Sequence, residues 1–314
     1  MRRAANVVLA VLTVLTGFPT LVRLVGDHEV MPFVLFVCAV PYLVVPLAVL
    51  LVAQAGLRRW VMTAVCAVLL LLNALWYVPL YVSDAPGKGA ALTVMTANLR
   101  YGEGDPFTVV KLVQAQHVDV LATEELTTKE VEDLRGAGLM NDLPYFRGTP
   151  DPQDGPDGSG LWSRYPITKQ AEWPTRFSSP GAVVHAPSGD LLVRVVHAAP
   201  PVAVEHGTYT RDVSVLKKQV RALPSNLPTI VLGDFNATVD NSLIRDLEGG
   251  RFRDSGELAG SGWVRTWGRQ PGTSLLLGLD HVLVDSRIGV RSTATFDVPR
   301  SDHDAFVARL TVRT

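Results

Sequence analysis

Three apolar stretches occupy the first 82 positions of the chain, at about residues 5–25, 32–55 and 60–82. A helix needs about 20 apolar residues to cross the hydrocarbon core of a bilayer. Each stretch reaches that length. The pattern therefore predicts a membrane-anchored protein with three transmembrane helices.

Two of these stretches carry residues that are unusual in a membrane-spanning helix. The first contains Pro19 and Arg23, and the second contains Pro41 and Pro46. A charged N-terminus followed by an apolar run is also typical of a signal peptide. No good small-residue cleavage site follows, and two further apolar stretches come at once. We therefore favour three spans, with a signal peptide as the alternative for the first.

The short connections between the stretches differ in charge. Arg2 and Arg3 precede the first stretch, Arg58 and Arg59 follow the second, and the connection at residues 26–29 is acidic. Basic loops stay in the cytoplasm. The sequence therefore predicts a multi-pass protein of the cell membrane, with a cytoplasmic N-terminus and an extracytoplasmic C-terminal part.

A different pattern begins after a Pro/Gly-containing linker at residues 83–91. Short apolar runs predict strands, and apolar positions spaced three or four residues apart predict helices. Strands are expected at 92–98, 118–122, 160–163, 183–185, 191–197, 229–232, 279–284 and 306–312, and helices at 107–117, 129–135 and 209–223. This order favours one α/β (α+β) domain over residues 92–314, a two-layer β-sandwich flanked by helices.

Charge and cysteine content narrow the function of this domain. Residues 83–314 hold 24 basic and 28 acidic residues, a net charge of −4. Proteins that mainly grip a nucleic-acid backbone usually carry a basic surplus. Both cysteines, Cys38 and Cys66, lie in the apolar N-terminal part, which excludes a thiolate metal site or a disulfide framework from the large domain.

Acidic, amide and imidazole side chains stand at the ends of several predicted strands. They are Asn98, Glu124, Glu125, His197, Asp234, Asn236, Asp280, Asp302 and His303. Each alone is typical of a turn or a surface pair. Together they indicate a catalytic site built at one edge of the sheets.

The order of these motifs resembles the endonuclease/exonuclease/phosphatase superfamily, whose fold is that of pancreatic deoxyribonuclease. The matching segments are Asn98, Glu125, Ser163-Arg164-Tyr165-Pro166, His197, Gly233-Asp234-Phe235-Asn236, Asp280 and Ser301-Asp302-His303. The resemblance covers about residues 92–312. It implies a divalent-metal-dependent hydrolase of phosphoric ester bonds, a phosphodiesterase or nuclease.

The resemblance also implies a metal site and its ligands. Glu125 would be the principal ligand, with Asp302 and Asn98 close to the metal and the phosphate. Carboxylate and amide oxygens suit Mg²⁺ or Mn²⁺.

The remaining roles that the resemblance implies are catalytic and substrate-binding. Asp234 would deprotonate the attacking water, and Asn236 would donate to a phosphoryl oxygen. Asp280 would hold His303. His197 would stabilise the phosphate or protonate the leaving oxygen, and Arg211 would contact the phosphate.

One departure and one open question remain. The family commonly has Gln where this chain has Glu124, which is either a tolerated neighbour or an extra carboxylate that alters metal affinity. The phosphodiester substrate is either a nucleic acid or a phospholipid or envelope polymer. The short tether to the bilayer favours the phospholipid or envelope polymer. A non-catalytic receptor that kept the fold is the alternative to an enzyme. No protein partner can be inferred.

Overall fold

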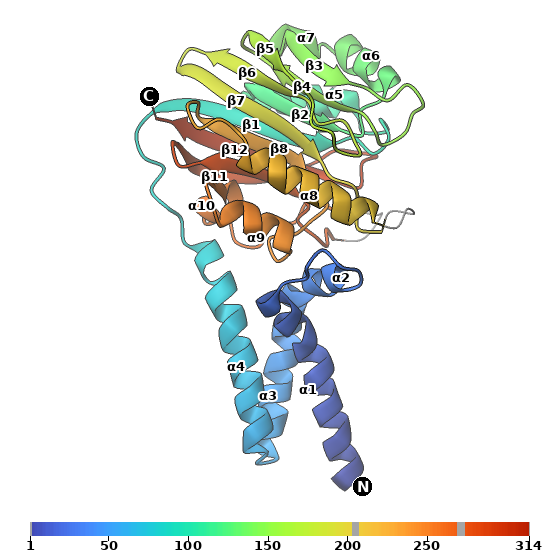
Figure 1. Cartoon of the computed structure of the whole chain (residues 1–314), viewed down its shortest axis with the longest axis vertical. Helices are drawn as coiled ribbons and strands as arrows, with labels where there is room; N and C mark the ends of the chain where they lie inside the picture. Colours follow the sequence, from blue (N-terminus) through green and yellow to red (C-terminus); the bar gives the residue numbers. More distant parts are fainter. Residues whose placement is uncertain (1, 203–206, 269–273, 314) are drawn as a thin grey trace.

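The computed structural model describes residues 2–202, 207–268 and 274–313 and consists of a helical bundle and a large α/β domain (Figure 1). Two mixed six-stranded sheets pack face to face in the domain. Their strand orders are β11-β12-β1-β2-β4-β3 and β5-β6-β7-β8-β10-β9. The predicted two-layer sandwich with flanking helices is thus confirmed.

The sheets are mixed because most neighbouring strands are antiparallel, whereas β1–β2 and β7–β8 are parallel. The first sheet contains β1 (Ala90–Asn98), β2 (Val120–Glu124), β3 (Tyr145–Thr149), β4 (Ser159–Ser163), β11 (Ile288–Asp297) and β12 (Asp304–Val312). The second contains β5 (Ile167–Gln170), β6 (Gly181–Ala186), β7 (Gly189–His197), β8 (Thr229–Asp234), β9 (Phe252–Asp254) and β10 (Asp280–Asp285).

Helices cover the outer faces of the sandwich. The domain's helices are α5 (Pro106–Ala115), α6 (Thr128–Gly136), α7 (Leu139–Asp142), α8 (Thr208–Arg221), α9 (Ser242–Glu248) and α10 (Ser255–Leu258). Alternate residues of a strand face opposite sides of the sheet. Leu92 and Val94 of β1 therefore lie in the core between the sheets, whereas Met95 and Ala97 pack in the apolar cluster that includes α5 residues.

The strands and helices predicted from the pattern all form, within two residues of the expected bounds. The pattern did not indicate β3, β5, β9 and β11. These strands are short, or many of their residues are only partly buried. Such positions lack the apolar run or the regular alternation that identifies a strand.

The N-terminal part forms α1 (Arg2–Val25), α2 (Phe33–Cys38), η1 (Val40–Leu43), α3 (Val44–Gly56), α4 (Trp60–Tyr77) and η2 (Pro79–Tyr81). Among the described residues, two helices are long and apolar enough to cross a membrane, at Asn6–Val25 and Trp60–Tyr81. The expectation of three such helices is wrong for the second stretch. Its helix breaks after Cys38, where Pro41 lacks an N–H and a short 3₁₀ turn forms. A shorter apolar helix remains at Val40–Gly56.

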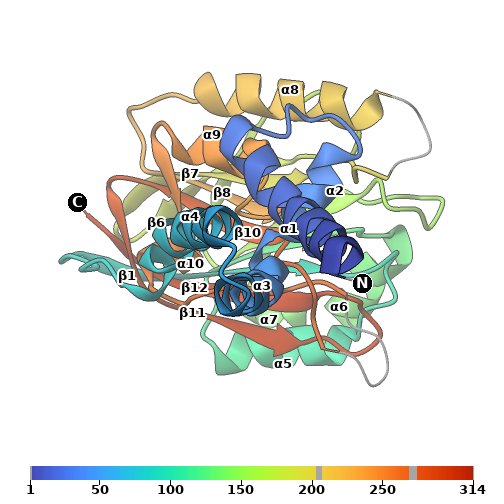
Figure 2. The ribbon, with the colours of Figure 1, turned by 90° about the horizontal axis from the view of Figure 1, so that it is seen from below.

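The bundle contacts the domain through a buried ion pair at the ends of α1 and α4. Arg23 Nε lies 2.5 Å from Asp240 Oδ1, and the Tyr77 hydroxyl donates to Asp240 Oδ2 at 2.9 Å. The guanidinium of Arg23 also lies 3.9 Å from the ring centroid of Trp76. Seen from below, α1, α3 and α4 stand together under the sandwich (Figure 2). The Arg23 side chain thus joins the end of α1 to the domain through Asp240.

We expect Arg23→Met to lower the stability of the full chain by about 3–5 kcal/mol, because it removes the ion-pair partner of the buried Asp240 carboxylate. The measurement is thermal unfolding in detergent. Lys129→Met is the matched control, since Lys129 pairs with Asp133 on an exposed helix face and such pairs contribute little. Equal melting temperatures for the two variants would contradict this prediction.

Candidate active site

The ends of five strands bring the candidate residues together. Asp280 at the start of β10 pairs with Asp234 at the end of β8, and His197 at the end of β7 pairs with the same Asp234. In the other sheet, Asn98 at the end of β1 pairs with Glu124 at the end of β2. The loop before β12 supplies Asp302 and His303.

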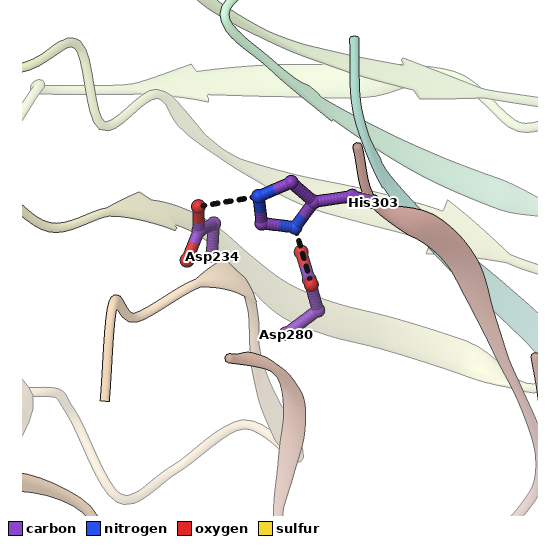
Figure 3. A group of neighbouring side chains, drawn as sticks. All are labelled: Asp234, Asp280 and His303. Atoms are coloured by element: carbon purple, nitrogen blue, oxygen red, sulfur yellow. Dashed lines mark hydrogen bonds and ion pairs between the residues drawn. The ribbon is translucent and has the colours of Figure 1, made fainter. Parts of the chain in front are cut away.

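His303 lies between two carboxylates (Figure 3). Its Nδ1 is 2.8 Å from Asp280 Oδ2, and its Nε2 is 3.7 Å from Asp234 Oδ2. Burial disfavours the charged imidazole, but the charges of Asp280 and Asp234 outweigh burial and raise the pKa of His303 to about 10. The ring is therefore a cation at neutral pH, held by Asp280 and directed at Asp234.

Asp234 is buried and receives several hydrogen bonds. Asn98 Nδ2 donates to its Oδ2 at 3.0 Å, and the backbone N–H of Asn236 donates to its Oδ1 at 2.8 Å. The Asn236 side chain donates to the carbonyl of Ala198 at 2.9 Å, which fixes the loop. Burial raises the pKa of Asp234 to about 7, although His303 favours its ionised form. A carboxyl group with this pKa is suited to general base catalysis near neutral pH.

His197 lies on the other side of Asp234, with its Nε2 3.9 Å from Asp234 Oδ2. Its ring stacks on Phe177 at a centroid distance of 4.4 Å. Burial, together with the positive charge of His303, lowers the pKa of His197 to about 3. At neutral pH this imidazole is therefore uncharged and offers one N–H donor.

Glu125 follows β2 in a left-handed conformation with φ of 52°. Such a backbone is costly for a residue with a side chain and is common at functional sites. Asn98 Nδ2 donates to Glu125 Oε1 at 3.0 Å, and the N–H of Tyr101 donates to Oε2 at 2.9 Å. Nearby, Asp302 Oδ2 accepts from Trp267 Nε1 at 3.1 Å. Asn98 thus links Glu125 to Asp234.

The residues present fit a divalent metal in two arrangements. Asp234, Asp280 and His303 each offer one ligand atom, and these atoms lie within 4.8 Å of one another. Glu125 and Asp302 supply two further carboxylates, and burial raises the pKa of Glu125. Among the described residues no lysine or arginine forms an ion pair with either of these two carboxylates. A cation would stabilise both of them, and all-oxygen donors are those that Mg²⁺ prefers.

These groups surround a cavity of about 310 Å³. Its lining includes the predicted residues Glu125, His197, Asp234, Asn236, Asp302 and His303. Asn98 and Asp280 are buried and do not line the cavity. Asn98 is hydrogen-bonded to Asp234, and Asp280 to His303, and both of these partners line it. Arg211 is exposed on α8 and is not among the lining residues. The structure therefore does not bring it to the site.

The cavity also contains residues that the sequence analysis did not single out. Arg100, Tyr101, Phe177 and Trp267 line it. Arg100 and Tyr101 come two and three residues after Asn98. Their position just after a strand that ends in a site residue is the one sequence signal that could have identified them. Nothing local marks Phe177 or Trp267, which reach the site from distant loops.

Glu124 lies beneath the site and is fully buried. Thr96 Oγ1 lies 2.9 Å and 3.0 Å from its two carboxyl oxygens. Burial, and then the charge of Asp280, raise the pKa of Glu124 well above its ordinary value. A neutral carboxyl group has nearly the shape and hydrogen-bonding capacity of a glutamine amide. Burial and the charge of Asp280 both disfavour an ionised Glu124, which favours the interpretation of Glu124 as a tolerated neighbour over that of an additional anion.

We expect Glu124→Gln to keep hydrolytic activity within about threefold of the parent, because one neutral hydrogen-bonding group replaces another. Glu124→Leu, which removes the partner of Thr96, is expected to lower both folding yield and activity. The measurement is the initial rate of phosphodiester hydrolysis with melting temperature alongside. A Glu124→Gln variant that folds but is inactive would show that the negative charge is needed.

Comparisons with known proteins find one family model that matches the large domain. The sequence profile of the Endonuclease/Exonuclease/phosphatase family matches residues 95–303. Comparison with curated proteins found no match.

Several solved structures share the fold. An endonuclease/exonuclease/phosphatase family protein from Bacteroides thetaiotaomicron is 17% identical, with a TM-score of 0.55 over 73% of this chain and 100% of that one. TDP2 from D. rerio, complexed with single strand DNA product, is 15% identical, with a TM-score of 0.59 over 71% and 100%. A mannosyl-6-phosphatase from Bacteroides thetaiotaomicron is 18% identical, with a TM-score of 0.53 over 70% and 99%.

Proposed function

Because the chain belongs to the endonuclease/exonuclease/phosphatase family, we propose that it is a membrane-anchored, metal-dependent phosphodiesterase. The observation that carries this proposal is the row Asp280, His303 and Asp234 at the base of a cavity that also holds Glu125 and Asn236. The aspartate beside the imidazole supplies a general base, and Glu125 supplies a nearby carboxylate for a divalent metal, and both suit phosphoester hydrolysis.

The proposed metal site consists of Glu125 and Asp302, with Asn98 positioning Glu125. Mg²⁺ or Mn²⁺, when bound, neutralises charge on the phosphate. Tyr101 and Trp267 hold the two carboxylates in place through their N–H groups. The Asp234, Asp280 and His303 group is instead assigned to proton handling, because the hydrogen bond from Asp280 to His303 Nδ1 holds the ring with its Nε2 toward Asp234.

Asp234 is proposed to accept a proton from the attacking water. The water oxygen forms a bond to phosphorus, and the bond from phosphorus to the leaving oxygen breaks. Protonated His303, held by Asp280, stabilises the ionised Asp234 and the negative charge that gathers at the phosphate. Neutral His197 and the Asn236 amide donate hydrogen bonds to phosphoryl oxygens. The contact with Arg211 predicted from the family pattern is not part of this proposal.

The membrane arrangement is proposed from the two long apolar helices, α1 and α4. Both end at Asp240, so they run in the same direction, and the shorter apolar helix Val40–Gly56 returns the chain between them. The basic residues at 58 and 59 then lie at the end of the bundle far from the domain. By the positive-inside rule this end is cytoplasmic and the domain is extracytoplasmic. A phosphatase reporter fused after residue 90 should be active, and an inactive fusion would reverse the orientation.

The test of the proposed function uses the full chain in detergent. Hydrolysis of bis(p-nitrophenyl) phosphate and of p-nitrophenyl phosphate is followed with Mg²⁺, with Mn²⁺ and with EDTA. We expect hydrolysis of the diester with either metal and a loss of at least about a hundredfold with the chelator. Equal rates with and without chelator would exclude metal dependence. A folded chain that cleaves neither compound would favour the non-catalytic alternative.

A further inference from the structure

One wall of the catalytic cavity comes from the membrane-proximal helix α2 rather than from the domain. Leu35 and Cys38 of α2 line the cavity together with Asp234, Asn236 and His303. Figure 1 shows α2 at the top of the bundle, between α1 and the domain. A substrate that enters the cavity therefore contacts a segment at the expected height of the bilayer surface.

The position of α2 is fixed by the loop that follows the catalytic Asp234. Asn241 Nδ2 donates to the carbonyl of Val34 at 3.0 Å, and Cys38 Sγ lies 3.4 Å from Asn241 Oδ1. The Val34 side chain is fully buried in the cluster that contains Phe235 and Ala237, the neighbours of Asn236. The helix is thus an integral part of the site.

The outer side of α2 is apolar and uncovered. We define the α2 face as Phe18, Met31, Phe33, Leu35 and Phe36, all of which are exposed. The rings of Phe18 and Phe36 meet edge to face at 5.6 Å. This face continues from the exposed apolar side of α1 into the cavity at Leu35, which is 42% exposed. An exposed apolar patch of this kind marks an interaction site.

The lining of the cavity contains both polar and apolar residues. The polar lining includes the catalytic groups and Arg100, and Arg100 is the one lysine or arginine among the described lining residues. The apolar lining is Leu35, Phe177, Pro200, Pro201, Leu277 and Leu279. One cation can bind a single phosphate group, and the apolar lining can contact a hydrocarbon chain attached to that phosphate. A nucleic-acid strand would require several backbone cations, and the net charge of residues 83–314 is −4.

We propose that the substrate is a phosphoester lipid of the adjoining membrane leaflet, with its phosphate at Asp234 and His303 and its hydrocarbon chain along Leu35 and the α2 face. The inference rests on the proposed phosphodiesterase function. Water adds to phosphorus, the bond from phosphorus to the leaving oxygen breaks, and the proton taken by Asp234 is returned to that oxygen. One product keeps the phosphate, and the other is the alcohol that contains the leaving oxygen.

The test varies only the hydrocarbon of the substrate. The full chain, in uncharged detergent micelles with Mg²⁺, is given p-nitrophenyl alkyl phosphates with methyl, octyl and hexadecyl groups, and plasmid DNA in parallel. We expect kcat/KM to rise by at least about tenfold from methyl to octyl, the contribution of roughly two buried methylene groups. DNA should be cleaved poorly. A flat series, or preference for DNA, would overturn the lipid assignment.

Variants separate contact at α2 from simple partition into micelles. Leu35→Glu should reduce the octyl-to-methyl ratio of kcat/KM by about tenfold or more, and Leu35→Ala is used should the charged variant not fold. Tyr145→Glu is the matched control, since Tyr145 is an exposed apolar residue on β3, far from the bundle (Figure 1). An equal ratio in parent, Leu35 variant and control would overturn the proposal. If no compound in the series is hydrolysed, the proposed function itself fails.

Discussion

Asp234→Asn is expected to lower kcat for bis(p-nitrophenyl) phosphate by about a thousandfold, within the usual range for loss of a general base. The substitution keeps the shape of the side chain at a fully buried position but removes the group that accepts the proton. Because burial raises the pKa of Asp234 to about 7, the base is protonated and inactive below that pH. The parent rate should therefore rise with pH up to about 7 and then level off.

The pH profile distinguishes this role from a structural one. Residual activity of Asp234→Asn should lack the rise with pH, whereas a variant that is only destabilised would keep it. Asp190→Asn is the control, since Asp190 is half-exposed at the opposite end of β7 from His197. An Asp234→Asn variant with more than about a tenth of the parent kcat would refute the assignment of Asp234 as the base.

Glu125→Ala is expected to raise the Mg²⁺ concentration for half-maximal activity by at least about a hundredfold. Groups that merely orient a metal ligand already contribute about 10–100-fold in metal affinity, and Glu125 is the proposed ligand itself. The measurement is a Mg²⁺ titration of the hydrolysis rate, supported by calorimetric titration of the protein with Mn²⁺.

The control for Glu125 is Glu132→Ala, which removes an exposed glutamate on α6. Its metal dependence should match that of the parent. If Glu125→Ala binds Mn²⁺ as tightly as the parent, the metal site lies elsewhere, and the group formed by Asp234, Asp280 and His303 becomes the candidate. Combining calorimetry with kinetics therefore decides between the two arrangements.

Glu124 and Glu125 show where sequence and structure contribute differently to the site. The strand that ends at Glu124 follows from its apolar run, so the sequence places two carboxylates at the edge of the sheet. Which of the two carboxylates enters the cavity depends on the backbone conformation. Glu124 completes the strand and points into the interior toward Thr96, whereas the left-handed turn at Glu125 directs the next side chain into the cavity.

Arg23 and Pro41 show the same contrast in the N-terminal part. By hydropathy alone, Arg23 is an unfavourable charged residue in a membrane helix. Its partner Asp240 is 217 residues away in the chain. Composition likewise favours one long helix over residues 32–55, but the chain bends after Cys38 and inserts Val34 into the cluster beside the catalytic loop. Docking against the domain gives this segment its shape.

The sequence by itself determined eight of the strands and three of the helices of residues 92–312, together with the candidate catalytic residue types at the strand ends. Strand and helix periods are properties of neighbouring residues, and a strand end is a local feature. Only the tertiary structure decided the ion pair at Asp240, the buried state of Glu124, the recruitment of Phe177 and Trp267, and the wall that α2 contributes to the cavity. These depend on contacts between distant segments, where burial and charge pairing set the free energy and the local pattern carries no information about the partner.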